Sequence, residues 1–217
     1  AFASWMAAKM TKQLNPEFES HLDLPQNNVM ALDARLSTKP IRKPIKTEAD
    51  IMDGLGLAYS KGSSVLAMVE NWIGEEAFQK GIQRYLKDFS YKNAEAADLW
   101  QALGKASNKD VASVLKSFIE QSSFPLVSVK QQGKKVTISQ SRFVNAGVDA
   151  PAQLWNVPVT IKYGAGDNVK TASVLLNKQS QTLDLDFAPE WIYPDQGALG
   201  YYRWVMDDAQ FNALIEN

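Results

Sequence analysis

The sequence predicts an α+β protein in which a helical part precedes a small antiparallel β-sandwich. Apolar residues recur at three- and four-residue steps from the N-terminus to about residue 122, which is the period of an α-helix. From about residue 124 to residue 205, apolar and polar residues alternate in short runs separated by glycine-containing turns, as in strands. We therefore expect a helical part at 1–122, a β-sandwich at 123–206 and the start of a further helical domain at 207–217.

The composition is that of an ordinary globular protein. The 217 residues are 45% hydrophobic and 22% charged, and a chain of this length can bury a core. Because the formal net charge is -1, there is no electrostatic reason to expect nucleic acid as a partner. The apolar stretches are far shorter than the roughly 20 residues that span a bilayer, so no membrane-spanning segment is expected. The absence of cysteine excludes thiol chemistry and favours no compartment.

Two helices are expected before residue 47. The first stops near Asn15 and has an apolar face at Phe2, Trp5, Met6 and Met10. Residues 16–46 contain several prolines and asparagines and should form an ordered loop around a short helix at Met30–Leu36. Thr47 and Asp50 then have the spacing of a capping box, with Asp in place of Glu.

Four amphipathic helices should follow. The longest is expected at about Leu57 to Ile73, with Gly74 just after its C-terminus. Glu75 opens the next helix, where a negative charge favours the N-terminal dipole. The residues that this second helix should bury are Phe78, Ile82, Tyr85 and Leu86. Asn93 can cap a third helix, and a fourth should begin near Asp110.

The period of the sequence changes after Pro125. Two hairpins are expected, Leu126–Lys130 with Lys135–Ser141 and Trp155–Tyr163 with Val169–Leu176. Further strands are expected at Thr182–Phe187 and Tyr201–Val205, and a helix should start from Asp207. Six or seven strands with tight turns are typical of a small antiparallel sandwich.

Few residues stand out chemically. His21 is the only histidine, and a surface or packed position is its simplest interpretation. The sequence has no H-E-x-x-H motif, no Gly-rich phosphate loop and no nucleophile elbow. Tyr59 lies near the start of the long helix, before Lys61-Gly62. Its phenol could face a cleft there, although a core or rim position is the more common role of such a residue.

Several short motifs occur in a recognisable order along nearly the whole chain. Ala58-Tyr59-Ser60-Lys61-Gly62 is followed by Trp72–Phe78, and Gln121–Pro125 precedes the strands. Further segments of the same series are Ala31-Leu32-Asp33, Asp98-Leu99-Trp100, Gln140–Phe143, Trp155–Pro158 and Gly200–Arg203. This ordered series resembles the zinc aminopeptidases of the aminopeptidase N (gluzincin) family, in which the first motif reads Y-x-K-G. Each motif is weak alone, but the ordered set is specific.

Two segments qualify the resemblance. Ser37–Ile41 is similar to the family's S-S-H-P-I, with Lys39 in place of the histidine. Ala1–Trp5 is similar to the residues that follow a zinc-ligating glutamate in the family's N-E-x-F-A-x-W helix. That glutamate is expected immediately before Ala1, and the H-E-x-x-H helix and the G-A-M-E-N loop further upstream. The resemblance thus implies an internal fragment, namely the helical end of a thermolysin-like catalytic domain and the following sandwich.

The resemblance also implies a function for the parent protein, by which we mean the longer protein expected to contain this chain. It would be a zinc-dependent hydrolase that removes N-terminal residues from peptides, with zinc held by two histidines and a glutamate. Tyr59 would be catalytic, as a hydrogen-bond donor to the oxyanion, and Lys61 would brace the helix start. No zinc and no activity are expected in this chain without the missing N-terminal and C-terminal parts. The alternative is a non-catalytic peptide- or partner-binding module with a decayed zinc site.

Overall fold

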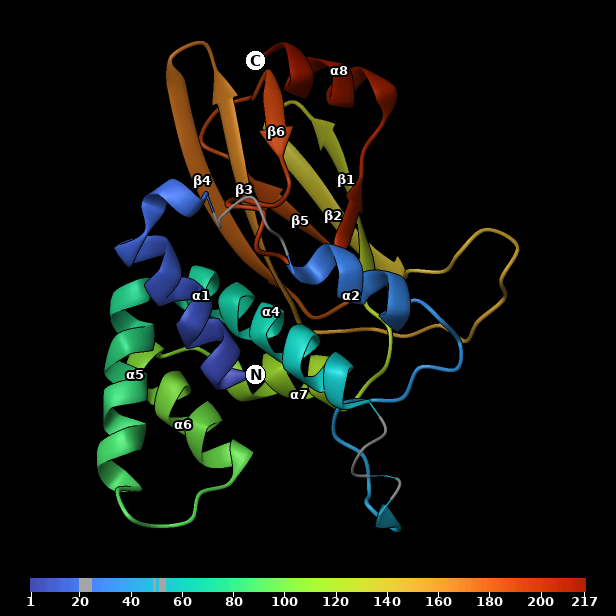
Figure 1. Cartoon of the computed structure of the whole chain (residues 1–217). Coiled ribbons are helices and arrows are strands. Elements are labelled where there is room, and N and C mark those ends of the chain that lie inside the picture. The colour runs from blue at the N-terminus through green and yellow to red at the C-terminus, as the bar shows by residue number, and fades with distance from the viewer. Residues whose placement is uncertain (20–24, 49, 51–53) are drawn as a thin grey trace.

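The computed structural model describes residues 1–19, 25–48, 50 and 54–217. In this part of the chain helices precede strands, and Figure 1 shows most helices on one side of two small sheets, with α8 at the opposite end. The helices are α1 (Phe2–Leu14), the 3-10 helix η1 (Pro16–Phe18), α2 (Pro25–Asp33), α4 (Leu55–Ile73), α5 (Glu75–Asp88), α6 (Ala96–Ser107), α7 (Val111–Ile119) and α8 (Asp208–Glu216). His21 lies outside the described residues.

The strands form two sheets. They are β1 (Pro125–Gln132), β2 (Lys135–Arg142), β3 (Val157–Ala165), β4 (Asn168–Leu176), β5 (Ser180–Asp184), β6 (Trp191–Tyr193) and β7 (Arg203–Val205). The order is β5-β2-β1-β7 in one sheet and β4-β3-β6 in the other. Both predicted hairpins are present, and the α+β class is confirmed. One pair departs from the antiparallel prediction: β7 runs parallel to β1, which it joins only after the chain has passed through the second sheet.

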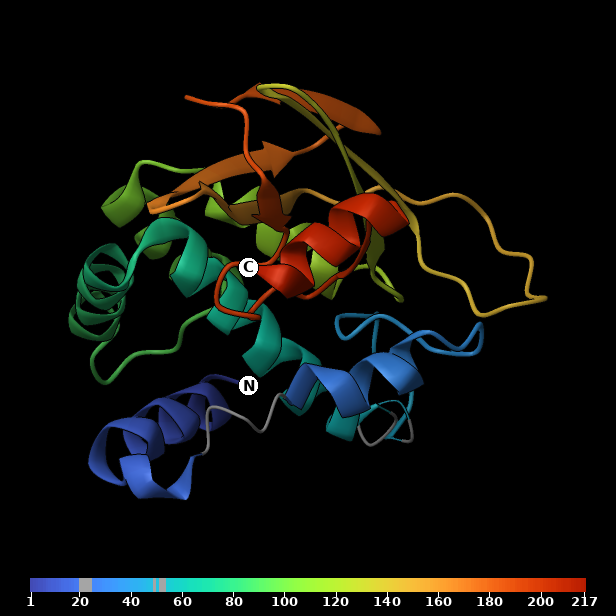
Figure 2. The same cartoon turned by 90° about the horizontal axis from the view of Figure 1, so that it is seen from above.

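A single hydrophobic core joins the helices to the sheets. Buried residues alternate along β1 and β3, where Val127 and Val129 face the same core as Val159 and Ile161. The same cluster includes side chains from α4, α5, α6 and α7. Figure 2 shows α4 passing beneath the sheets, and α4 contacts α1, α2, α5, α7 and β3. Helix α4 is therefore the central element of the molecule.

Three sequence signals for helix ends, at Gly74, at Asp110 and at Thr47 with Asp50, are confirmed by the structure. Gly74 follows α4 with φ +91, a conformation that glycine adopts without strain, as predicted. Asp110 caps α7, accepting from the Ser113 N–H at 3.1 Å. Thr47 and Asp50 bond reciprocally: the N–H of Thr47 donates to Asp50 Oδ2 at 2.9 Å, and the N–H of Asp50 donates to Thr47 Oγ1 at 3.3 Å.

Three helix predictions need correction. The short helix expected at Met30–Leu36 is α2, which begins earlier at Pro25, a residue suited to the first helical position. Helix α6 is capped by Glu95 rather than Asn93, since the N–H of Glu95 donates to Asp98 Oδ2 at 2.7 Å. On α5, Leu86 is exposed and Tyr85 only partly buried, while Phe78, Gly81 and Ile82 are buried. Among the residues that the structure describes, no helix combines the length and the apolar character needed to cross a membrane.

Candidate active site at the start of helix α4

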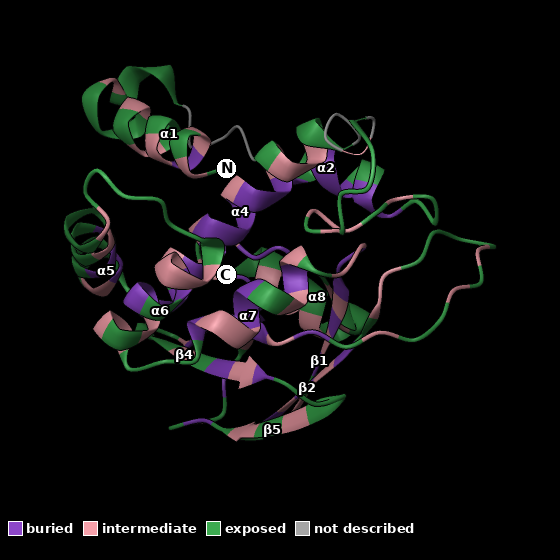
Figure 3. Ribbon diagram, turned by 90° about the horizontal axis from the view of Figure 1, so that it is seen from below, coloured by how far each residue is buried: buried purple, intermediate pink, exposed green. Residues whose placement is uncertain are grey.

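Tyr59 lies on the exposed side of the second turn of α4. Its side chain is 53% exposed, whereas Lys61, two residues later, is completely buried. Successive residues in an α-helix are about 100° apart, so positions 59 and 61 point to nearly opposite sides of the helix. Figure 3 shows that much of α4 is buried. The exposed Tyr59 is thus attached to a helix whose other side is held in the core.

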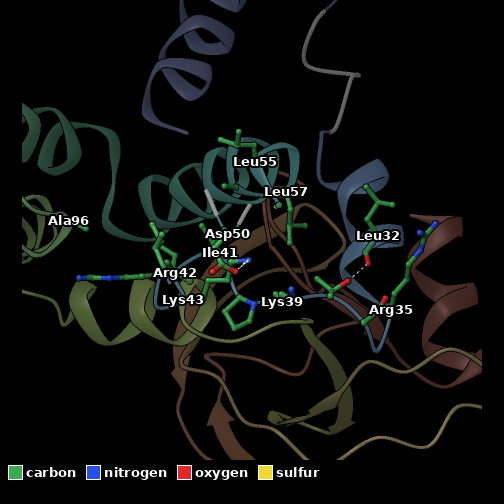
Figure 4. Close-up of a pocket in the computed structure, with 17 residues that line it drawn as sticks. Leu32, Arg35, Lys39, Ile41, Arg42, Lys43, Asp50, Leu55, Leu57 and Ala96 are labelled. Carbon is green, nitrogen blue, oxygen red and sulfur yellow. Dashed lines mark hydrogen bonds and ion pairs between the residues drawn. The ribbon is translucent and has the colours of Figure 1, made fainter. Parts of the chain in front are cut away.

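An open cavity of about 600 Å³ lies beside the start of α4. Figure 4 shows that its walls come from α2, from the segment at 37–45 and from the first turns of α4. Ala58 belongs to its lining, and the adjacent Tyr59 does not. The cavity is therefore next to the predicted catalytic residue, without enclosing it.

The cavity combines apolar walls with basic side chains. Its basic residues are Arg35, Lys39, Arg42 and Lys43, against one acidic residue, Asp50. Lys43 Nζ lies 3.7 Å from Asp50 Oδ1. Arg42 extends toward α6, where its guanidinium carbon lies 6.0 Å from the centre of the Trp100 ring. Lys39, which stands where the similar family has histidine, belongs to this lining.

The buried side of α4 contains an ion pair that the sequence analysis did not predict. Lys61 Nζ lies 2.8 Å from Asp33 Oδ2, and both side chains are completely buried. The ammonium group also donates to the backbone carbonyls of Gln121 and Ser123, each at 3.1 Å. An ammonium group has three N–H donors, so these three oxygens satisfy its hydrogen-bonding capacity.

Asp33 at the end of α2 joins this pair to the β-sheet part of the chain. Its Oδ1 accepts from the N–H of Ser123 at 2.9 Å, and its Oδ2 accepts from the hydroxyl of Tyr201 at 3.1 Å. Phe118 and Phe124 pack edge-on against the Tyr201 ring, with centroids 6.1 and 6.0 Å away. We call Lys61, Asp33, Tyr201 and the backbone of Ser123 the buried network.

The electrostatics of the buried network keep the hydroxyl of Tyr201 protonated. Burial raises the pKa of Tyr201, and the negative charge of Asp33 raises it further. Burial lowers the pKa of Lys61, and the charge and hydrogen bond of Asp33 oppose that change. Tyr201 is therefore a permanent hydrogen-bond donor to Asp33 at ordinary pH.

The start of helix α1 packs against helix α4. A Cβ atom placed on Gly62 would lie 2.6 Å from the Cβ of Ala1, closer than real Cβ contacts, so only glycine permits this approach. Trp5 is buried one turn into α1, and its ring packs on Phe78. Because residues three apart on a helix share a side, the start of α1 lies on the side of α4 that presents Tyr59.

The sequence contained a signal for the buried network. Lys61 lies four residues before Val65 and seven before Met68, in line with the buried stripe of α4. A lysine in such a stripe needs an acidic partner. Which acid fills that role depends on tertiary contacts, and Asp33 and Tyr201 are distant from Lys61 in sequence. The interpretation of Lys61 as a brace agrees with these contacts.

The described residues do not group the side chains that a zinc site needs. Within the described ranges, no three or more His, Cys, Asp or Glu side chains are grouped closely enough to hold a metal ion. These residues therefore do not fit the zinc site that the resemblance implies.

The class of the protein follows from comparison with known families. The family model for the Peptidase family M1 domain matches residues 1–118, which is more than half of the chain. The chain belongs to this peptidase family, in agreement with the resemblance found in its motifs. The match includes α4, Tyr59 and every residue that lines the cavity except Ile119.

Individual relatives are aminopeptidases. The chain is 34% identical over 192 residues to the alanine/arginine aminopeptidase of Saccharomyces cerevisiae, covering 85% of this chain and 22% of that protein. It is 31% identical over 225 residues to the puromycin-sensitive aminopeptidase of Caenorhabditis elegans, covering 99% and 24%. It is 30% identical over 207 residues to the leucyl aminopeptidase of Saccharolobus solfataricus, covering 94% and 26%. The chain thus spans about a quarter of the length of these relatives.

Proposed function

We propose that this chain is part of a zinc-dependent aminopeptidase that removes N-terminal residues from peptides, with Tyr59 as a catalytic residue. The observation that carries the proposal is the exposed Tyr59 on helix α4, whose opposite side is buried in the core, within the region that matches the peptidase family. The names of the relatives support the same activity.

The proposed role of Tyr59 is to donate a hydrogen bond. Attack on an amide carbonyl places negative charge on its oxygen, and a fixed O–H donor stabilises that charge more in the transition state than in the ground state. A neutral phenol can do this without losing its own proton. Tyr59 is on a long helix anchored in the core, which is the kind of support that an effective donor needs.

The start of α1 supports this placement. The resemblance puts a zinc-ligating glutamate immediately before Ala1, and Ala1 lies against Gly62 on the Tyr59 side of α4. In the parent protein, the expected ligand position would then be on the same side of α4 as the phenol. A hydrogen-bond donor and a metal ion that act on the same substrate carbonyl must lie on the same side of α4.

The experiment compares Tyr59→Phe with wild type in the parent protein, with an aminoacyl anilide as substrate. The variant should lower kcat by ~10²–10³-fold and change KM little, because the lost bond matters mainly in the transition state. Tyr91→Phe is the control, since Tyr91 is fully exposed outside the site, and it should retain wild-type kcat. Wild-type kcat in Tyr59→Phe would refute the role of Tyr59.

The same substrate tests whether the chain acts alone. We propose that the isolated 217-residue chain does not hydrolyse it, because the resemblance places the zinc ligands outside the chain. Turnover by the isolated chain that disappears on adding a chelator would contradict this proposal.

The second candidate function is a non-catalytic peptide-binding module. The cavity beside Ala58 favours it, since apolar walls and basic side chains could hold a peptide without any chemistry. The sequence just upstream of Ala1 in the parent gene distinguishes the two candidates. An intact H-E-x-x-H followed by N-E supports the peptidase, and its absence supports the binding module.

A further inference from the structure

We propose that Lys61, Asp33 and Tyr201 are positioning residues that set the direction of Tyr59 by fixing the rotation of α4 about its own axis. The inference rests on the proposed catalytic role of Tyr59 and goes beyond it. It assigns part of the control of the active site to Tyr201, a residue next to β7 that lies far from Tyr59 in sequence.

The first argument is the directional nature of the contacts. Lys61 Nζ is held by three oxygens, at 2.8 Å from Asp33 Oδ2 and at 3.1 Å from the carbonyls of Gln121 and Ser123. Rotating α4 would pull the ammonium group away from all of them and leave a buried charge without partners, which is strongly unfavourable. Since Tyr59 is two residues from Lys61 on the same rigid helix, fixing Lys61 also fixes Tyr59.

The second argument is that a buried ion pair is a poor way to gain stability. Replacing such a pair with well-packed apolar side chains is often neutral or stabilising, because desolvation of the charges offsets their attraction. Apolar packing, however, tolerates small rotations that directional hydrogen bonds do not. A donor to a reacting carbonyl must be placed accurately, since a misplacement of about 1 Å can cost ~10²-fold in rate.

The third argument is that the segment after β6 contacts α4 at further points. The N–H of Tyr201 donates to Met68 Sδ at 3.3 Å, and Asn71 Nδ2 donates to the carbonyl of Gln196 at 2.9 Å. Gln26 on α2 donates to the carbonyl of Ala198. The segment from Gln196 to Tyr201 thus holds α2 and α4 together, and the Tyr201 hydroxyl reaches the Tyr59 end of α4 through Asp33, which pairs with Lys61.

Two matched variants in the parent protein test the proposal. Tyr201→Phe removes the hydroxyl that donates to Asp33, while Asp33 keeps Lys61 and the Ser123 N–H, so the variant is expected to fold. Tyr202→Phe is the control: it is equally a buried tyrosine, and its hydroxyl donates to the carbonyl of Pro194 at 2.8 Å, outside the buried network. Both variants lose one buried hydrogen bond, so thermal unfolding should show similar loss of stability.

The first readout is kinetic. Tyr201→Phe should lower kcat by about ten-fold or more, up to the ~10²-fold expected for a misplaced group, with little change in KM. Tyr202→Phe should retain wild-type kcat. Wild-type kcat in Tyr201→Phe, or an equal loss of kcat in both variants, would contradict the positioning role.

The second readout does not depend on activity. A fluorotyrosine placed at position 59 alone gives one ¹⁹F line, which should shift or broaden in Tyr201→Phe and stay unchanged in Tyr202→Phe. An unmoved line in Tyr201→Phe, or an equal shift in both variants, overturns the positioning role whatever the kinetics. Wild-type kcat in Tyr59→Phe would instead refute the proposed function, and the ¹⁹F line would still decide whether the buried network orients position 59.

Discussion

At the scale of single residues, α4 shows how two neighbouring positions acquire opposite roles. Tyr59 faces outward with half of its side chain exposed, and Lys61 faces the core with none. The sequence predicted the helix, and the catalytic role of Tyr59 stays a prediction. It did not predict the environment of Lys61, because Asp33 and Tyr201 reach it only through the fold.

The glycines of α4 give the first prediction at this scale. Gly56→Ala should raise the free energy of unfolding by about 0.5–1 kcal/mol, since a Cβ there meets no atom and alanine is the better helix former. Gly62→Ala should lower it, because the new Cβ would lie 2.6 Å from Ala1 Cβ, and the N–H of Trp5 binds the Ala1 carbonyl. Chemical denaturation of the chain measures both. A stabilising Gly62→Ala would contradict the close contact of α1 with α4.

Asp195 gives a prediction of pH dependence. Burial raises the pKa of its carboxyl from 3.8 to about 6, although the N–H of Gly200 donates to it at 2.8 Å. A raised folded-state pKa of an acid adds stability at low pH, and that stability is lost as the pH rises through about 6. Asp195→Asn, which imitates the protonated form, should match wild type near pH 4 and become more stable by up to ~3 kcal/mol at pH 7.

Denaturation of both proteins from pH 4 to pH 7 checks this prediction. Asp149→Asn, at an exposed position, controls for the loss of a negative charge in itself. An Asp195→Asn variant whose advantage over wild type is the same at every pH would contradict the account of a destabilising buried carboxylate.

At the scale of secondary structure, long periodic segments were predictable and short ones were not. The helices α1, α4 and α7 agree with their apolar periods, as do the two hairpins. Helix α2 was displaced in the prediction because two of its buried residues, Gln26 and Asp33, are polar and hide its apolar period. Strand β6 was missed because three residues are too short to show alternation. The parallel pairing of β7 depends on its path through the whole fold.

The contrast between two lysines tests the energetics of these elements. Lys61→Met leaves Asp33 as a buried charge without its cation and should lower the free energy of unfolding by about 3–5 kcal/mol. Lys80→Met removes an even shorter ion pair, 2.6 Å from Glu76, at exposed positions and should change stability little. Adding Asp33→Asn to Lys61→Met should recover part of the loss.

Chemical denaturation of the three variants gives the comparison. Equal stability of Lys61→Met and Lys80→Met would show that the buried network contributes no more than a surface pair. It would also weaken the argument that Lys61 fixes the rotation of α4.

At the scale of the whole molecule, one core connects the helices to both sheets. We propose that residues 1–122 and 123–206 belong to two domains, with 207–217 beginning a third. The buried network crosses the first boundary, because Asp33 and Lys61 come from one part and Ser123 and Tyr201 from the other. Motif order was enough to predict the family, whereas the coupling between the two parts required the structure.

The most direct test of the central claim is a single-turnover measurement on the parent protein with Tyr59→Phe at saturating substrate. This measurement isolates the chemical step from substrate binding and product release. If Tyr59 stabilises the developing oxyanion, the single-turnover rate constant should fall by ~10²–10³-fold relative to wild type, while substrate affinity stays the same. A rate constant equal to that of wild type would contradict the claim that Tyr59 takes part in catalysis.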